Sequence, residues 1–217
     1  AYASPTFAMT FPNHQQLRFI VKPLWFIACL LPFAWMLIAL FGLAGQSLGP
    51  EPIEAMQDHL GLWGLRILLL TLALTPLRRL SGRSWWVQLR RMTGLFCLFY
   101  ISCHFLNYLV LDQSFDWPII WEDVLERPYI TIGVLALLAL LPLGITSTNG
   151  WMRRLGKGWQ KLHRLVYPIA ILGCWHFWWQ VKQDIVEPLV YALILAALLG
   201  IRMFYRKNGT RNNSAST

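Results

Sequence analysis

The sequence predicts an all-α, polytopic membrane protein: a bundle of six transmembrane helices within residues 23–205. Three observations predict this fold class. Hydrophobic residues make up 56% of the 217 residues and charged residues only 13%, whereas soluble domains contain about 25% charged residues. Apolar runs long enough to cross a bilayer recur along the chain. The charges in the connections between these runs alternate in sign, which is typical of loops on opposite sides of a membrane.

Six apolar runs are the predicted spans, and they cover residues 24–43, 60–77, 92–111, 129–145, 162–180 and 189–204. Pro32 lies inside the first run and predicts a kink there. Arg66 interrupts the second run near its start, where its side chain can extend towards the headgroups or meet an anionic group of a ligand. We expect residues 1–22 to form a cytoplasmic N-terminal segment and residues 206–217 a disordered cytoplasmic tail.

The charged residues separate by connection. Of the 19 Lys and Arg, 15 lie in the N-terminal segment, the 78–91 connection, the 150–164 connection and the tail. All ten Asp and Glu lie in the three other connections. Basic loops mark the cytoplasmic side of a membrane, so both termini are expected in the cytoplasm and the acidic loops outside. This alternation also argues against the nucleic-acid binding that a net charge of +9 would otherwise suggest.

The four cysteines lie in apolar runs without CxxC spacing, which predicts buried, inert thiols and no zinc site or disulfide framework. Three histidines also lie in or at the apolar runs, where an ionisable side chain is costly and usually faces a partner or a cofactor. His104 in the third run and His176 in the fifth are predicted at similar depth on the outer side. His163, at the start of the fifth run, is predicted near the inner interface.

Two imidazoles at one depth on two helices that run in the same direction can bind one iron from opposite faces. Such bis-histidine haem ligation leaves no open position and favours electron transfer over oxygen binding. The alternative is that His104 and His176 are hydrogen-bonded polar residues of the bundle and that His163 is an interfacial basic residue. His14 and His59 lie outside the predicted spans and are expected to be solvated.

Helical phase separates the inner position from the outer one. His163 and His176 would lie about 140° apart on an ideal helix, and Pro168 between them is expected to kink or over-wind the helix and partly restore the phase. Arg90 would share a face with His104 on the third span. Because arginine is a poor iron ligand, we expect Arg90 or Arg91 to bind a propionate or a phosphate.

Several motifs carry a family resemblance: TPLRR at 75–79, RRMTGL at 90–95, RPYITIG at 127–133, ITST at 145–148 and LGKGWQKLHRLVY at 155–167, together with His104 and His176. Over residues 20–205 the chain resembles the haem-binding membrane subunits of bacterial methionine sulfoxide reductase systems, in the ferric-reductase-like transmembrane family. The resemblance implies His104, His163 and His176 as haem ligands. Wider relatives carry a second histidine on the third span where this chain has Arg90.

The resemblance also implies cofactors and partners. They are one or two b-type haems, FMN as a further candidate, and the quinone pool or a cytoplasmic flavin reductase as electron donor. The implied acceptor is MsrP, a periplasmic molybdenum enzyme that repairs methionine sulfoxide. In this interpretation the chain is a non-catalytic electron-transfer subunit of the bacterial inner membrane, in which Arg66, Arg90 and Arg91 are candidates for contacts with the cofactors.

Two other functions remain open from the residues. A self-contained ferric reductase would act directly on a small external acceptor, which the acidic outer loops would attract. A transporter would use the histidines as a proton relay, but no inverted repeat or pair of broken helices supports it. The sequence has no GxGxxG motif and no βαβ pattern after the sixth run, so we expect no dinucleotide-binding domain.

Overall fold

The computed structural model describes the backbone of residues 12–181 and 185–214, and side chains as far as residue 205. The described chain is helical and contains no strand. The helices are α1 (His14–Gln16), α2 (Lys22–Leu40), α3 (Pro52–Ser81), α4 (Trp86–Leu106), α5 (Trp117–Glu126), α6 (Pro128–Ile145), α7 (Asn149–Leu155), α8 (Lys157–Leu162), α9 (Val166–Gln180) and α10 (Val186–Ser214). Short π-helical turns follow α1 (Leu17–Val21) and α4 (Asn107–Asp112), and 3-10 turns lie at Leu43–Gly45 and His163–Leu165.

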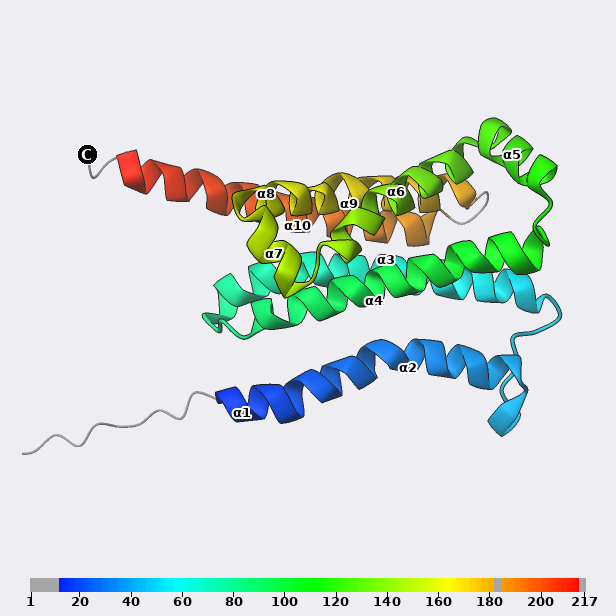
Figure 1. Ribbon diagram of the computed structural model, residues 1–217, viewed down its shortest axis with the longest axis horizontal. Helices are drawn as coiled ribbons and strands as arrows, with labels where there is room; N and C mark the ends of the chain where they lie inside the picture. The colour runs from blue at the N-terminus through cyan, green and yellow to red at the C-terminus, as the bar shows by residue number, and fades with distance from the viewer. Residues whose placement is uncertain (1–11, 182–184, 215–217) are drawn as a thin grey trace, which may run out of the picture.

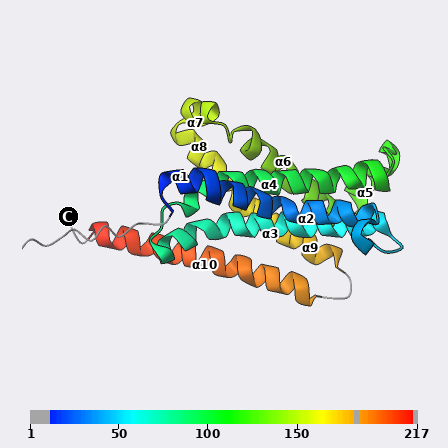
Figure 2. The same ribbon diagram turned by 90° about the horizontal axis from the view of Figure 1, so that it is seen from below.

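The long helices lie side by side along one common axis, with α5 at one end and α7 and α8 at the other (Figures 1 and 2). The start of α1 and the end of α10 lie at the same end of the bundle as α7 and α8. The buried core lies mainly where α3, α4, α6 and α9 meet, around side chains such as Leu68, Cys97, Leu140 and Ile169. Because most other large side chains of the long helices are apolar and exposed, the outer surface of the bundle suits lipid.

Five helical stretches among the described residues are long and apolar enough to cross a membrane: His14–Leu40, Pro52–Ser81, Trp86–Asp112, Pro128–Ile145 and Val186–Tyr205. The predicted multi-pass membrane protein is therefore confirmed. The predicted fifth span lies along the same axis, but its helix α9 has only 15 residues, because the 3-10 turn His163–Leu165 separates it from α8. The number of six spans stays a prediction.

The ends of the chain differ from the predicted segments. The first helical stretch begins at His14, ten residues before the predicted run, because Asn13 and Gln16 cap it with reciprocal side-chain bonds. Residues 1–11 of the predicted N-terminal segment lie outside the described residues. Helix α10 continues to Ser214, into the segment predicted as a tail; extending an existing helix costs little compared with starting one. The disordered tail stays a prediction.

At Pro32, where a kink is expected, a side chain of α4 forms hydrogen bonds with the backbone of α2. The Phe33 N–H donates to the Tyr100 hydroxyl (2.9 Å), and that hydroxyl donates to the Cys29 carbonyl (2.9 Å). The tyrosine hydroxyl is thus inserted into the backbone ladder of α2 next to the proline, a known cause of helix bending. His59 also bonds the Pro32 carbonyl (2.9 Å), so the expectation that His59 is solvated is wrong: α3 extends to Pro52 and carries His59 against α2.

Tyr100 is fully buried, so Tyr100→Phe should destabilise the contact between α2 and α4. The change leaves a buried donor and a buried acceptor without their shared partner, which costs about 1–3 kcal/mol. We expect a lower midpoint of unfolding in detergent, measured by circular dichroism against SDS fraction. Tyr191→Phe is the control, because its hydroxyl bonds half-exposed Arg66 and water can replace that bond. Equal midpoints for the two variants would contradict the inserted-hydroxyl account.

Candidate functional site: two cavities within the helix bundle

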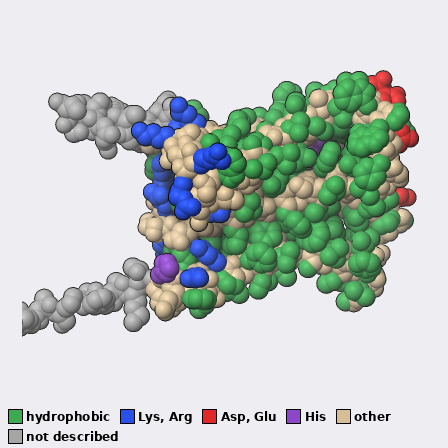
Figure 3. Space-filling model, viewed as in Figure 1, with side chains coloured by type: hydrophobic (Ala, Val, Ile, Leu, Met, Phe, Trp, Pro, Cys, Tyr) green, Lys and Arg blue, Asp and Glu red, His purple; other side chains and the backbone are tan. Residues whose placement is uncertain are grey.

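Two histidines meet towards the end of the bundle that is predicted to face outward, in a cavity whose lining includes Asp58, Asp112 and Glu187. Asp and Glu gather at this end (Figure 3). His104 comes from α4 and His176 from α9, and the centres of their rings lie 6.1 Å apart with the ring planes at 85°. Both side chains line a cavity of about 520 Å³. The prediction that the two imidazoles lie at the same depth is confirmed.

His104 is held by one turn of α3. Its Nδ1–H donates to the Gln57 carbonyl oxygen (3.0 Å); because a carbonyl only accepts, Nδ1 carries the proton and Nε2 keeps its lone pair. One turn along α3, Gly61 lies against the face of the ring. A Cβ at Gly61 would lie 2.9 Å from Cε1 of His104, so only glycine leaves room for the ring.

His176 is held in the same way by α6. Its Nδ1–H donates to the Tyr129 carbonyl (2.7 Å), and a Cβ at Gly133 would lie 2.9 Å from both Cε1 and Nδ1 of the ring. In each case the glycine lies four residues after the residue whose carbonyl accepts the bond. Both imidazoles therefore have a defined tautomer and a defined ring orientation, as metal-binding histidines usually do.

Gln57 and Asn107 extend the support of His104, and the sequence analysis missed both. The Gln57 carboxamide nitrogen lies 3.4 Å from His104 Nε2, and Asn107 donates to the Gln57 side-chain oxygen (2.8 Å). Asn107 begins the π-helical turn that follows α4, a type of irregularity that is frequent at functional sites. The Gln57 amide therefore lies near the free nitrogen of His104, at a long distance, and is itself held by Asn107.

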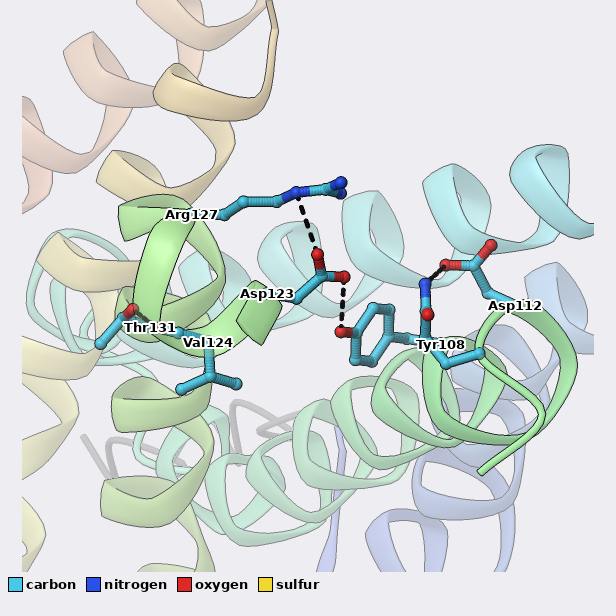
Figure 4. A network of polar contacts seen from close by, with 7 residues as sticks. Tyr108, Asp112, Asp123, Val124, Arg127 and Thr131 are labelled. Carbon is cyan, nitrogen blue, oxygen red and sulfur yellow. Dashed lines mark hydrogen bonds and ion pairs between the residues drawn. The ribbon is translucent and has the colours of Figure 1, made fainter. Parts of the chain in front are cut away.

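The rim of this outer cavity is charged, whereas its walls are mostly apolar. Asp58, Asp112, Glu187 and Arg127 belong to the lining. Arg127 makes an ion pair with Asp123 (3.0 Å), and Asp123 accepts from the Tyr108 hydroxyl (2.9 Å), so this network joins α5 to the end of α4 (Figure 4). Arg127 is a cation at the outer cavity that the sequence analysis did not select, since it stands alone among acids in its connection.

The structure does not bring Arg66 to either cavity. Its guanidinium donates to the Tyr191 hydroxyl (2.7 Å), lies 3.6 Å from the Glu187 carboxylate and lies over the Trp63 ring. Arg66 lies near the middle of α3 rather than near the start of a span, because the helix begins eight residues before the predicted run. Its bonds to Tyr191 and Glu187 of α10 hold the side chain at the exposed surface of the bundle, away from both cavities.

The second cavity, of about 330 Å³, lies at the basic end and is lined by His163, Arg90 and Arg91, as expected for an inner site. Arg202 of α10 is a further lining cation, within the sixth predicted span. The described lining residues include no Asp or Glu. The inner cavity therefore suits a ligand that carries an anionic group.

His163 has one ring nitrogen without a partner. Its Nδ1–H donates to the Trp159 carbonyl (3.1 Å), and the Trp159 ring stacks on it with centres 3.9 Å apart. Its Nε2 is buried and has no hydrogen-bond partner, although an unsatisfied buried polar atom is costly. His163 starts the 3-10 turn that precedes Pro168, and a 3-10 turn is over-wound, so the expected distortion before Pro168 is confirmed.

Comparison with known proteins places this geometry in a family. The model of the ferric reductase like transmembrane component matches residues 60–174, which include His104 and His163. The chain belongs to this family. His176 lies two residues beyond the matched region, so its place beside His104 is evidence independent of that match.

Family members with curated names are similar over most of their length. A protein of Xanthomonas euvesicatoria pv. vesicatoria is 47% identical over 196 residues, which is 89% of this chain and 90% of that protein. A protein of Rhodospirillum rubrum is 51% identical over 181 residues, 82% of this chain and 85% of its own. Both carry the name protein-methionine-sulfoxide reductase heme-binding subunit MsrQ.

Proposed function

We propose that the chain is a b-type haem electron-transfer subunit of the bacterial inner membrane, which passes electrons to a periplasmic methionine sulfoxide reductase. The observation that carries the proposal is the pair His104 and His176. Their Nδ1 atoms are tied to backbone carbonyls and their ring centres lie 6.1 Å apart. Two imidazoles on one metal, each about 2 Å from it, place their ring centres about 6 Å apart.

The residues of the outer cavity fit a haem. The His104 and His176 Nε2 atoms keep their lone pairs for the iron, apolar side chains of α3, α4 and α6 suit the porphyrin, and Arg127 at the rim suits a propionate. Bound there, the haem supplies one-electron chemistry. Two strong ligands exclude oxygen from the iron. Gly61 and Gly133 lie against the two rings and would keep both imidazoles in a fixed orientation towards the haem.

The inner cavity is the proposed entry point of the electrons. The unpaired Nε2 of His163 can ligate a second haem or bond a quinol oxygen. Arg90, Arg91 and Arg202 suit a propionate or the phosphate of FMN. A quinol of the membrane pool, or a cytoplasmic flavin reductase, is the donor in this proposal, and one or two haems carry the electrons outward.

The proposed direction of electron transfer rests on the distribution of charged residues, and the proposed partner rests on the names of the relatives. Lys and Arg gather at the end of the bundle that contains the inner cavity, and Asp and Glu at the other (Figure 3), which supports cytoplasmic termini and an outer haem that faces the periplasm. The relatives are named as subunits of a methionine sulfoxide reductase. We therefore propose MsrP as the acceptor that docks over the outer cavity.

A self-contained ferric reductase is the second candidate, favoured by one observation. Asp58, Asp112 and Glu187 lie at the rim of the outer cavity, where they would attract a small cationic acceptor. In that case no partner protein would be needed for turnover.

Reconstitution distinguishes the two functions. The purified protein should show a dithionite-reducible Soret and α-band of six-coordinate b-type haem. In liposomes, a reduced quinol should reduce that haem, and MsrP should reoxidise it much faster than ferric citrate at equal concentration, measured by stopped-flow absorbance. Reoxidation by ferric citrate at the rate of MsrP would favour the ferric reductase instead. A colourless, folded protein would refute both.

A further inference from the structure

The two cavities share one layer of side chains. Leu68 of α3, Cys97 of α4 and Leu140 of α6 line both the inner and the outer cavity. Their exposed fractions are 5%, 1% and 5%, so all three are buried. A residue that lines both cavities lies at the boundary between them, so the two cavities adjoin at the level of these three side chains.

The flanking positions show how thin the layer is. On α3, Leu65 lines only the outer cavity and Leu72 only the inner one. On α6, Leu137 lines only the outer cavity and Leu143 only the inner one, with Leu140 between them. One helical turn, about 5 Å, therefore leads from one cavity to the shared layer and another turn leads into the other cavity.

Helix α4 carries a polar residue of each cavity, one on either side of this layer. Arg90 lines the inner cavity, Cys97 both cavities and His104 the outer one, at intervals of seven residues. Seven residues span about 10 Å of helix, so along α4 Arg90 and His104 each lie about two turns from Cys97, on opposite sides of it. The lining residues of α4 between Arg91 and His104 are Gly94, Cys97 and Ile101, and none of them is charged.

We propose that Leu68, Cys97 and Leu140 form a dry partition that lets electrons cross between the cavities and prevents water and protons from crossing. The inference rests on the proposed electron-transfer function. One electron leaves the reduced centre on the inner side and reduces the oxidised centre on the outer side, and no bond forms or breaks. A proton needs a chain of hydrogen-bonded groups or waters, and small voids lined by apolar side chains stay dry.

The partition answers a need that the two cavities create. The inner cavity contains Arg90 and His163, and the outer one contains Asp58 and His104. Polar cavities that open towards opposite sides of a membrane would join into a proton leak if water connected them. The three buried side chains of the partition lie where the two cavities adjoin and would interrupt that path.

The test is proton flux through liposomes that contain the purified holoprotein. Leu140→Ser removes bulk from the partition and adds a hydroxyl that can hold water, so this variant should raise proton flux several-fold over wild type. A pH-sensitive dye trapped inside the liposomes measures the flux after a pH jump. Leu137→Ser and Leu143→Ser are matched controls, because each makes the same change on the same helix in the wall of one cavity only. Both should keep the flux of wild type.

Several outcomes would overturn the partition. Leu140→Ser with the flux of wild type would do so, and so would controls that leak as much as Leu140→Ser. Leu68→Ser replaces Leu140→Ser if the latter does not give a monodisperse, helical protein. In the unsubstituted protein, Cys97 should resist a charged thiol reagent added to either side of the membrane, and labelling from both sides, mapped by mass spectrometry, would refute the proposal independently. Failure of quinol to reduce the haem would refute the proposed function but would leave the flux comparison valid.

Discussion

His176→Ala and His104→Ala should each abolish haem binding in the outer cavity. Each change removes one of two ligands that lie on opposite sides of the proposed iron site, with ring centres 6.1 Å apart, and no other described histidine lines that cavity. Haem content per protein, measured as the pyridine haemochrome, should fall to zero, or to one haem per protein if a second haem binds in the inner cavity. The bands of six-coordinate outer haem should disappear from the spectrum of the reduced protein.

Exposed His14 is the first residue of the first helical stretch and lines neither cavity, so His14→Ala is the control and should retain the full haem content. Added imidazole should restore part of the spectrum of His176→Ala, because a free ligand can enter the space that the side chain leaves. A His176→Ala or His104→Ala protein with unchanged haem content and spectrum would show that the pair does not ligate haem.

Gly133→Ala should reduce haem content several-fold although it adds only a methyl group. The new Cβ would lie 2.9 Å from two atoms of the His176 ring, so the ring must turn away and lose its 2.7 Å bond to the Tyr129 carbonyl. Alanine is about 1 kcal/mol better than glycine within a helix, so the helix itself should not be weakened. We therefore expect a folded protein with low haem content or a shifted spectrum.

Gly173→Ala is the matched control for Gly133→Ala. Gly173 also lines the outer cavity, but a Cβ there would lie 3.7 Å from its nearest neighbour, which is ordinary van der Waals contact. Haem content and thermal stability should be measured for both variants in the same detergent. If both retain the haem content of wild type, the contact between Gly133 and His176 does not orient the ligand.

The spans and the outer histidine pair were predictable because each depends on a property that a single helix carries. Length and hydropathy define a span whatever its neighbours are, and the alternating loop charges orient it. The depth of His104 and His176 follows from counting residues from the basic connections. The seven-residue spacing of Arg90, Cys97 and His104 is also visible in the sequence, but its meaning depends on the cavities that other helices close.

The surroundings of other residues could not be predicted, because they depend on contacts between helices that are distant in sequence. Arg66 was expected near the headgroups or a cofactor, and its partners Tyr191 and Glu187 lie more than 100 residues later in the chain. Arg202 lies in the sixth predicted run and was not singled out there, although α10 places its side chain at the inner cavity. Gln57 carries no unusual sequence signal, because its backbone carbonyl orients His104.

The sequence by itself determined that this chain is a helical membrane protein and which histidines share a depth. Hydrophobicity, charge and helical rise act locally, so they can be read along one chain. Only the tertiary structure decided what surrounds those histidines: the carbonyls and glycines of α3 and α6, the unpaired nitrogen of His163 and the single layer between the cavities. These features arise from close packing between helices distant in sequence, and packing depends on the shape of both partners at once.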